Sequence, residues 1–376
     1  MWVANIIDGL GWGGAQKLLL TFTETASRRG IDTLVISLKP ERNKADVPER
    51  LKAAGAKVIQ LSYRKLFDPR AIPALVSLLK NEQASVVHTH LSHSNILGSM
   101  AAKAVGIPAV STLHNTRATV RTKLSMRIKI ERYCLRRLTA RVIAVGENVA
   151  DVYRPLLGER ALDVIPNAVS AGLMIDAQKR KAIRTELMGN SDRTLVIAVG
   201  RLQLQKGYRD MLSAFAQVHE LHPRAFLIII GVGNLLDSLT EYCQSLGISD
   251  HVRFLGARGD VPELLAAADV FVNSSHWEGL SIAMLEAMAA GLPVVATAVG
   301  DAEILLSTGG GLLAEAQNPD AFARALTGML HDPEKMCAMG RTAREYVERN
   351  YSAEAWLDKL VDCYTLAQEK KAMGEN

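Results

Sequence analysis

Two carboxylates, Glu278 and Glu286, stand in a stretch of small and apolar residues at 276–297 that reads HWEGLSIAMLEAMAAGLPVVAT. The apolar residues at 281–290 predict a helix buried on most sides, with Glu286 as its one charged residue. A buried carboxylate costs several kcal/mol unless it is paired or hydrogen-bonded. Glu286 therefore requires a partner, which is either an internal arginine or a ligand with hydroxyl groups, such as the diol of a ribose.

Glu278 lies three residues before this predicted helix, in the loop that approaches it. The amides of Gly279, Leu280 and Ser281 are expected at the helix N-terminus, where free amides and the helix dipole form an anion site. A phosphorylated nucleoside would satisfy these amides and Glu286 together. The alternative is that Glu278 only favours the positive end of the helix.

Two cations follow a predicted strand at 194–200. The segment VGRLQLQKG at 199–207 places Arg201 and Lys206 in the loop after that strand, next to Gly200. An arginine can bind a phosphate through two hydrogen bonds and a lysine acts as a point charge, so the pair suits a diphosphate. The alternative is a pair of solvated surface charges.

A glycine-rich loop near the start of the chain lies between a predicted strand and a predicted helix. Gly13 and Gly14, in IDGLGWGGAQKLLL at 7–20, let backbone approach a ligand closely and leave amides free at the helix start. The loop matches neither the dinucleotide-binding fingerprint nor the P-loop. By itself it predicts no particular ligand.

Four histidines cluster at two predicted strand ends: His88, His90 and His93 in HTHLSHSN, and His114 in TLHNT. No carboxylate or cysteine accompanies them at metal-ligand spacing, so no metal site is predicted. His114 is the best placed to contact a sugar hydroxyl or to take part in proton transfer. For the other three, structural hydrogen bonding is an equal alternative.

Alternating apolar runs and helix-like segments must position these side chains, and the alternation predicts an α/β protein with parallel sheets. One series of predicted strands spans 3–167 and a second spans 194–300, with the polar segment 171–193 between them. We therefore expect two doubly wound, Rossmann-like domains, 1–168 and 169–351. They are expected to face a central cleft at the carboxyl ends of both sheets.

Composition restricts the class of protein further. The four cysteines form no CxxC pair, a pattern that fits a reducing cytosol. No apolar run is long enough to cross a membrane, so we expect a soluble protein or one held at a membrane surface. The basic excess concentrates in 116–141, where nine Lys or Arg face only Glu131. Interspersed apolar residues predict a basic amphipathic helix that could rest on anionic lipid or serve a diphosphate-linked acceptor; a solvated helix face is the alternative. Because no stacking platform or recognition motif accompanies the charges, nucleic acid is not an expected partner.

With these segments in place, the chain resembles the retaining, nucleotide-sugar-dependent glycosyltransferases of family 4, which have the GT-B fold. The resemblance extends from Gly9 to the C-terminal helix and rests on an ordered series of motifs. They are the GG loop at 13–14, TLHN at 112–115, VIPNAV at 164–169, VGRLQLQKG at 199–207, IIGVGN at 229–234, VRFLG at 252–256 and EGLSIAMLEAMAAGLPVVAT at 278–297. In this fold the last helix, here 352–376, crosses back to the acceptor-binding first domain.

The resemblance implies a role for each candidate residue. Glu278 and Glu286 match an E-x7-E motif, in which the first glutamate contacts the donor sugar and the second binds the nucleotide ribose. Arg201 and Lys206 would bind the diphosphate and stabilise the departing nucleotide in place of a metal, and His114 would contact the donor sugar. The other donor-binding residues would be Gly13, Gly14, Gly200, Gly233, Gly279, Leu280 and Ser281, with Leu255 and Arg258 beside the base.

Two positions depart from the family pattern. Gln16 replaces the usual glutamate of GGAE, so an acceptor contact through a charge at this position is not expected, and AVGE at 144–147 replaces AVSE. Retention in such enzymes is described as front-face attack, with the leaving phosphate oxygen helping to deprotonate the acceptor. Glu278 is therefore not expected to act as a nucleophile.

The resemblance thus implies an enzyme that moves a sugar from a nucleoside diphosphate to a glycan or lipid-linked glycan in cell-surface polysaccharide or lipopolysaccharide biosynthesis. Family frequency favours a uridine donor, with guanosine next, and no metal or cofactor is expected. We expect a cytoplasmic protein that can sit on the inner face of the cytoplasmic membrane. The alternatives are a sugar-nucleotide epimerase or a phosphorylase of the same fold, or a non-catalytic nucleotide-sugar sensor.

Overall fold

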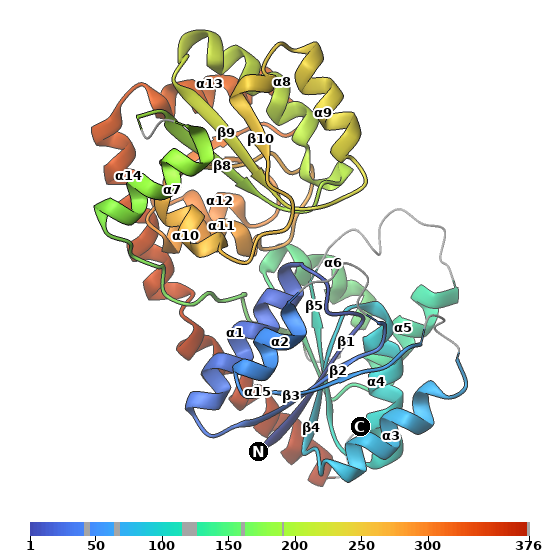
Figure 1. The fold of residues 1–376 in the computed structure, drawn as a ribbon. Helices are drawn as coiled ribbons and strands as arrows, with labels where there is room; N and C mark the ends of the chain where they lie inside the picture. Colours follow the sequence, from blue (N-terminus) through green and yellow to red (C-terminus); the bar gives the residue numbers. More distant parts are fainter. Residues whose placement is uncertain (41–45, 64–67, 115–125, 159–161, 190–191, 374–376) are drawn as a thin grey trace. The chain divides into compact units, whose positions relative to one another are not determined.

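The computed structural model describes residues 1–40, 46–63, 68–114, 126–158, 162–189 and 192–373. The chain divides into two compact units, shown in Figure 1. Unit 1 comprises Met1–Ala168 together with Ala353–Asn376, and unit 2 comprises Val169–Ser352. Each unit is built around one parallel sheet that is covered by helices, in agreement with the predicted α/β class.

The sheet of unit 1, as far as the chain is described, has seven strands in the order β3-β2-β1-β4-β5-β6-β7. Adjacent strand residues face opposite sides, and both sides are apolar. Ile6 and Leu34 pack under α3 and α4, whereas Ile7 and Val35 pack under α1 and α2. The strands are β1 Trp2–Ile7, β2 Asp32–Ser37, β3 Lys57–Gln60, β4 Val86–His90, β5 Ala109–Leu113, β6 Arg141–Ala144 and β7 Leu162–Val164. The helices are α1 Gly14–Arg28, α2 Val47–Ala53, α3 Ala71–Asn81, α4 Ser92–Val105, α5 Met126–Arg137, α6 Glu147–Leu157 and α15 Ala353–Ala372.

The sheet of unit 2 has six strands in the described ranges, in the order β10-β9-β8-β11-β12-β13. Val196, Leu227 and Val272 pack under α8, α9 and α13 on one face. The strands are β8 Thr194–Val199, β9 Ala225–Ile230, β10 Val252–Phe254, β11 Val270–Asn273, β12 Val294–Thr297 and β13 Gly311–Ala314. The helices are α7 Ala177–Met188, η1 Leu204–Lys206, α8 Tyr208–Leu221, α9 Leu236–Ser245, η2 Ser249–His251, α10 Val261–Ala267, α11 Ile282–Ala289, α12 Ala302–Leu306, α13 Pro319–Leu330 and α14 Pro333–Asn350.

Both sheets reverse their strand order at one point, and the candidate residues gather there. In unit 1 the reversal lies between β1 and β4, and in unit 2 it lies between β8 and β11. Successive connections leave in opposite directions from such a point, so the loops beyond the carboxyl ends of the two strands diverge and leave room for a ligand. Arg201 and Lys206 lie between β8 and β9, and Glu278 lies between β11 and α11.

The C-terminal helix α15 belongs to unit 1 and packs on its sheet and on α1. The rings of Trp356 and Phe22 meet edge to face with their centroids 6.2 Å apart. The hydroxyl of Tyr364 lies 2.7 Å from Nδ1 of the buried His88 on β4. Unit 1 is therefore completed by the last helix of the chain. No helix in the described ranges has the length and apolar character needed to cross a membrane.

Candidate active site

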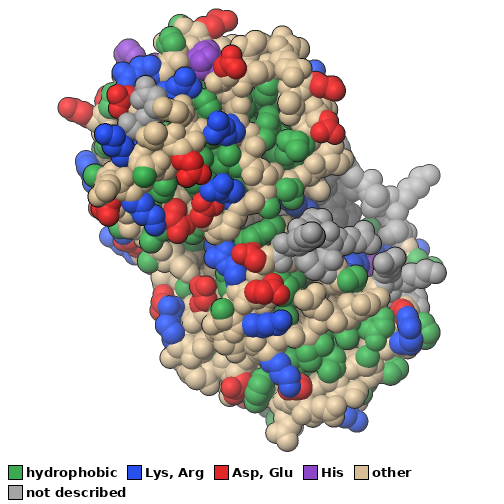
Figure 2. All heavy atoms as spheres, viewed as in Figure 1, with side chains coloured by type: hydrophobic (Ala, Val, Ile, Leu, Met, Phe, Trp, Pro, Cys, Tyr) green, Lys and Arg blue, Asp and Glu red, His purple; other side chains and the backbone are tan. Residues whose placement is uncertain are grey.

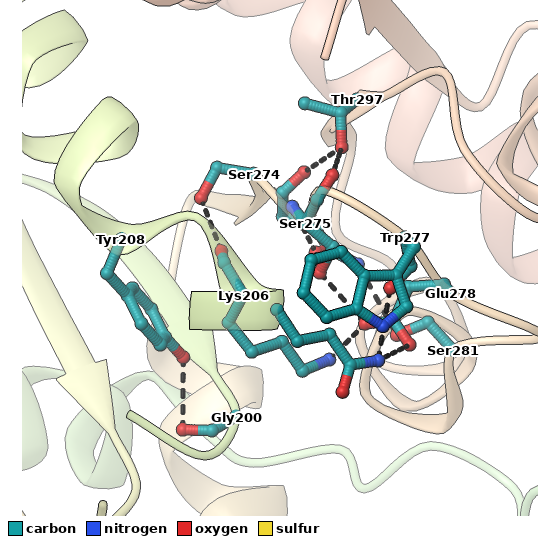
Figure 3. A network of polar contacts seen from close by, with 11 residues as sticks. Gly200, Lys206, Tyr208, Ser274, Ser275, Trp277, Glu278, Ser281 and Thr297 are labelled. Atoms are coloured by element: carbon teal, nitrogen blue, oxygen red, sulfur yellow. Dashed lines mark hydrogen bonds and ion pairs between the residues drawn. The ribbon is translucent and has the colours of Figure 1, made fainter. Parts of the chain in front are cut away.

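An ion pair between Lys206 and Glu278 lies at the strand-order reversal of unit 2 (Figure 3). Lys206 ends η1, after β8, and Glu278 follows β11. The Ser275 hydroxyl donates to Oε1 of Glu278 at 2.8 Å, and the Gln205 amide donates to Oε2 at 3.3 Å and to the carbonyl of Trp277 at 3.0 Å. Both charged side chains are only partly exposed, with 16% and 13% of their surfaces accessible.

Hydrogen bonds join the two loops that carry this pair to each other and to the end of the neighbouring strand β12. The Ser274 hydroxyl donates to the carbonyl of Lys206 at 2.9 Å, and the amide of His276 donates to the carbonyl of Gln205 at 2.8 Å. The hydroxyl of Thr297, at the end of β12, donates to the carbonyl of Ser275 at 2.6 Å. These hydrogen bonds hold the backbone of the two loops in place, and with it the backbone positions of Lys206 and Glu278.

Glycines in these loops are required by close backbone approach. Gly207 adopts φ +61°, and a Cβ there would lie 2.1 Å from the carbonyl oxygen of Ser274. A Cβ on Gly233 would lie 2.1 Å from the carbonyl oxygen of Leu202. Gly200 accepts a hydrogen bond at its carbonyl from the hydroxyl of Tyr208 at 3.0 Å. Burial and the nearby Glu278 charge raise the pKa of Tyr208, so this phenol remains a donor.

Arg201 and Arg258, the two predicted arginines of the site, differ in their surroundings. Arg201 is exposed and forms no ion pair with any described residue. Arg258 instead forms a two-point ion pair with Asp260, at 2.8 and 2.6 Å. Leu255 follows β10 and is bonded through its amide to the carbonyl of Ile229 at 3.0 Å. Arg201 can therefore take a new anionic partner without breaking an ion pair, whereas Arg258 would have to leave Asp260.

The second glutamate of the motif, Glu286, is half-buried on α11. Helix α11 begins at Ile282 with Ser281 as its N-cap residue, and the Ser281 side chain does not cap the helix. The preceding Gly279 and Leu280 are buried. The helix therefore starts close to where the sequence predicts, and its N-terminus adjoins the loop of Glu278.

The glycine-rich loop of unit 1 is closed by its own glutamine. Gly13 is the N-cap residue of α1, which begins at Gly14. The Gln16 amide donates to the carbonyl of Gly9 at 2.7 Å, across the loop. Because this amide holds the loop, the residue that departs from the family pattern has a structural use here.

Three of the four clustered histidines take part in two separate sets of hydrogen bonds in unit 1. The ring of His88 lies between the hydroxyls of Tyr364 and Thr112, each 2.7 Å away. His90 contacts Oδ1 of Asn5 and Nε2 of His114, both at 3.2 Å. Burial lowers the pKa of His88 to about 3, that of His114 to about 4 and that of His90 well below its ordinary value. All three rings are therefore neutral at physiological pH.

Sequence reasoning did not single out Asp8, although it lies at the strand-order reversal of unit 1. Asp8 follows β1 and reaches the first turn of α4, where Oδ1 accepts from the amide of Ser94 at 2.9 Å and from its hydroxyl at 2.8 Å. Oδ2 lies 3.0 Å from Nδ1 of His93. The only available signal was an acidic residue at the end of a predicted strand, next to the glycine-rich loop.

The basic segment predicted at 116–141 is only partly described, because 115–125 lie outside the described residues. Helix α5 covers Met126–Arg137, and Glu131 turns inward to accept from Ser92 at 2.5 Å and from the Asn95 amide at 3.0 Å. The outward side carries exposed cations that form no ion pair with any described residue. Residues of this side line a surface hollow of about 450 Å³; they are Lys129, Arg132, Tyr133, Arg136 and Arg137.

The site in unit 2 suits an anion that carries hydroxyl groups. A diphosphate would attract Lys206 away from Glu278 and would gain the exposed Arg201 as a second cation. Glu278, Glu286 and Gln205 are hydrogen-bond partners for hydroxyl groups. These are the demands of a nucleoside diphosphate linked to a sugar.

Two family models match the chain. The model of Glycosyltransferase Family 4 matches residues 12–172, and that of Glycosyl transferases group 1 matches residues 179–346. Together they span most of both units.

The relatives and solved structures that resemble the chain have related names. It is 29% identical over 307 residues, 79% of each chain, to the UDP-Gal:alpha-D-GlcNAc-diphosphoundecaprenol alpha-1,3-galactosyltransferase of Escherichia coli. It is 30% identical over 215 residues to the lipopolysaccharide core biosynthesis glycosyltransferase LpsE of Rhizobium meliloti, covering 57% of this chain and 59% of that one. The structure of Anabaena HepE with UDP-glucose superposes with a TM-score of 0.84 over 96% of this chain and 99% of HepE, at 21% identity. This last likeness shows the fold.

Proposed function

Because this chain belongs to the family 4 glycosyltransferases, which have the GT-B fold, we propose that it transfers a sugar from a uridine diphosphate donor to a lipid-linked glycan with retention of configuration. The enzyme is a glycosyltransferase that uses a nucleotide-sugar donor. HepE was crystallised with UDP-glucose, and the name of the Escherichia coli relative specifies UDP-Gal and a diphosphoundecaprenol acceptor. These names support the uridine donor and the lipid-linked acceptor.

The observation that carries the proposal is the group of Arg201, Lys206 and Glu278 at the strand-order reversal of unit 2. In the proposed reaction, Lys206 and Arg201 hold the diphosphate and neutralise the charge that develops when the bond to the sugar breaks. They do so in place of a metal ion. Glu278 is released from Lys206 and accepts hydrogen bonds from hydroxyls of the donor sugar, while Glu286 accepts those of the ribose.

The acceptor is proposed to attack from the face that the diphosphate leaves, so that the leaving phosphate oxygen takes the hydroxyl proton. Orientation and charge stabilisation then supply the catalysis, and no covalent sugar intermediate on Glu278 is needed. Proton NMR of the product tests retention, because the anomeric configuration in the new linkage is expected to equal that of the donor.

We further propose that helix α5 holds the enzyme at an anionic membrane surface, where a lipid-linked acceptor resides. Its exposed Lys and Arg residues lack ion-pair partners among the described residues. By contrast, the surface of unit 2 seen in Figure 2 intersperses Lys and Arg with Asp and Glu. Each uncompensated basic residue near an anionic membrane contributes on the order of 1 kcal/mol.

Calorimetric titration with UDP, GDP and ADP, each with and without EDTA, tests the donor site. We expect UDP to bind most tightly and EDTA to leave its affinity unchanged. Preferential binding of GDP would replace the proposed base, and loss of binding in EDTA would contradict a site that relies on Arg201 and Lys206 instead of a metal.

The same titration tests the ribose assignment. Glu286→Ala is expected to weaken UDP binding roughly tenfold or more, because hydrogen bonds to a charged group are lost. Glu303→Ala removes an exposed carboxylate from α12 and serves as the matched control. Equal UDP affinity in the two variants would remove Glu286 from the nucleotide site.

A further inference from the structure

The pair formed by Asp8 and His93 has no part in the donor site described above. Asp8 is held firmly, since the amide and hydroxyl of Ser94 both donate to its Oδ1. Its Oδ2 faces Nδ1 of His93 at 3.0 Å. The side chains of Asp8 and His93 retain 19% and 20% of their surface, so the pair is partly open to solvent.

These bonds determine which nitrogen of His93 carries the proton. Burial disfavours the ionised form of Asp8, but the hydrogen bonds from His93 and Ser94 outweigh it and lower the pKa of the Asp8 carboxyl. A carboxylate only accepts hydrogen bonds, so Nδ1 of His93 must donate. When the ring is neutral, Nε2 is then an acceptor with a free lone pair. No described residue bonds to it.

His88 and His90 differ from His93 in this respect. His88 uses both ring nitrogens, with Tyr364 and Thr112, and His90 uses both, with Asn5 and His114. Their contacts are satisfied within the protein. In His93, by contrast, Nδ1 is bonded to the Asp8 carboxylate, and Nε2 has no partner among the described residues. Nε2 can therefore bond to a ligand.

The place of the pair in the fold favours a ligand. Asp8 follows β1 and His93 lies in the first turn of α4, directly after β4, so the pair stands at the strand-order reversal of unit 1. Ligands of doubly wound sheets bind outside the carboxyl ends of the strands at this point. The glycine-rich loop begins at the next residue, Gly9.

We propose that His93, oriented by Asp8, binds the acceptor by accepting at Nε2 a hydrogen bond from a hydroxyl group of the acceptor sugar. This inference rests on the proposed transferase function. A hydroxyl is the matching chemical group because it donates a hydrogen bond and is carried by every glycan. Asp8 acts as the positioning residue, since it selects the tautomer whose Nε2 accepts.

Two substitutions at one position separate this role from folding. In His93→Asn the side-chain amide falls near the position of Nδ1, so it can still donate to Asp8 but cannot reach the acceptor. In His93→Gln the amide falls near the position of Nε2, and its oxygen can still accept a hydrogen bond from a hydroxyl group. Lys103→Ala changes an exposed side chain in the last turn of α4, at the other end of the helix from His93, and is the control.

The assay uses an N-acetylglucosaminyl diphosphate on a short alkyl chain as the acceptor and the donor chosen by titration. We expect His93→Asn to raise the acceptor KM about 3- to 10-fold, the usual loss for one hydrogen bond, with the donor KM unchanged. His93→Gln is expected to recover part of that loss, and Lys103→Ala to stay within about twofold of the wild type. Equal UDP affinity and melting temperature confirm that each variant is folded.

Monodeoxy derivatives of the acceptor complete the test. One derivative is expected to raise the KM of the wild type by the same factor and to have no further effect on His93→Asn, because both changes remove the same bond. If the wild type is active but His93→Asn keeps its acceptor KM, the role of His93 is wrong and the proposed function stands. If the wild type transfers no sugar to this probe, the proposed acceptor is wrong, and with it the assignment of His93 to that acceptor.

Discussion

Lys206 and Glu278 neutralise each other, so under the proposed function an incoming diphosphate would compete with a carboxylate for one ammonium group. The competition would couple two events, because a donor that binds Lys206 would also free Glu278 to accept hydrogen bonds from the sugar. A nucleotide without a sugar would bind Lys206 and leave Glu278 with Ser275 and Gln205 alone. The proposed roles therefore predict that the pair favours the complete donor over its product.

Removing the ammonium group should affect turnover more than binding. For Lys206→Ala we expect kcat to fall roughly 10²- to 10³-fold, because the charge that Lys206 stabilises develops as the bond to the sugar breaks. The donor dissociation constant is expected to change by much less. Steady-state kinetics and calorimetry give the two values, and an unchanged kcat would remove Lys206 from the chemical step. Arg341→Ala, on the exposed side of α14, is the control for loss of a cation from unit 2.

At the scale of elements, a glycine in a loop of unit 2 can be required for two reasons: a positive φ angle, or backbone too close to leave room for a Cβ. Two glycines separate these reasons. Gly207 and Gly247 have similar φ angles, +61° and +69°, but only Gly207 has backbone within reach of a new Cβ. Gly247→Ala should therefore cost about 1 kcal/mol of unfolding free energy from the left-handed conformation alone. Gly207→Ala should cost clearly more, because the loop must move away from Ser274. Denaturant unfolding of both variants checks the difference, and equal losses would contradict it.

Helix α15 contacts His88, a buried histidine that is neutral in the folded protein. A histidine in an unfolded chain has a pKa of about 6.5, whereas burial lowers the pKa of His88 to about 3. Between these two pKa values the unfolded chain binds a proton that the folded chain does not. The free energy of unfolding therefore falls as the pH is lowered from about 6.5 toward 3. Between pH 7 and pH 4 we expect this one group to cost roughly 3 kcal/mol of unfolding free energy.

Urea denaturation at pH 7 and pH 4 measures that loss. His88→Gln can keep contacts with Tyr364 and Thr112 but has no proton to bind, so its stability should depend less on pH than that of the wild type. His331→Gln changes an exposed histidine and should behave like the wild type. A pH dependence in His88→Gln equal to that of the wild type would show that His88 is not the group responsible.

The elements that sequence reasoning missed have two different causes. Strand β13 reads GLLA and contains no β-branched residue, the type that is enriched in strands. Helix α7 falls in a segment that was recognised only as polar, because few of its residues are apolar, and Arg180 and Arg184 form ion pairs with Asp269 at 2.6 and 2.9 Å. Strands rich in β-branched residues were predictable, whereas a strand without them and a helix held partly by charge were not.

The same distinction applies to the candidate site. The motifs led to Lys206 and Glu278, but their mutual ion pair joins residues 72 positions apart and left no local pattern. Asp8 was missed for the same reason, since its partners His93 and Ser94 lie in the first turn of α4, more than 80 residues away in the sequence. Short motifs reveal which residues are available, and only the folded sheet reveals which of them meet.

For the whole molecule, the uneven distribution of charge predicts reversible attachment to membranes. Arg132→Gln with Arg136→Gln should weaken binding to phosphatidylglycerol vesicles by about tenfold or more, since each cation contributes on the order of 1 kcal/mol. Arg324→Gln with Arg341→Gln, which removes two exposed cations from unit 2, is the matched control. Vesicle sedimentation in low salt and in 1 M salt, where the screening length falls to about 3 Å, measures the effect. Binding that is unaffected by salt would contradict attachment through α5.

The return of α15 to unit 1 affects the order in which the protein can fold during synthesis. The ribosome makes the described strands of unit 1 first, but Trp356 and Tyr364, which contact Phe22 and His88, emerge only after all of unit 2. At about 5–20 residues per second, that delay is on the order of ten seconds or longer. Through this interval the nascent first unit has an uncovered apolar surface, which is the kind of surface that chaperones bind. The second unit, which is continuous in sequence, can fold before the first is complete.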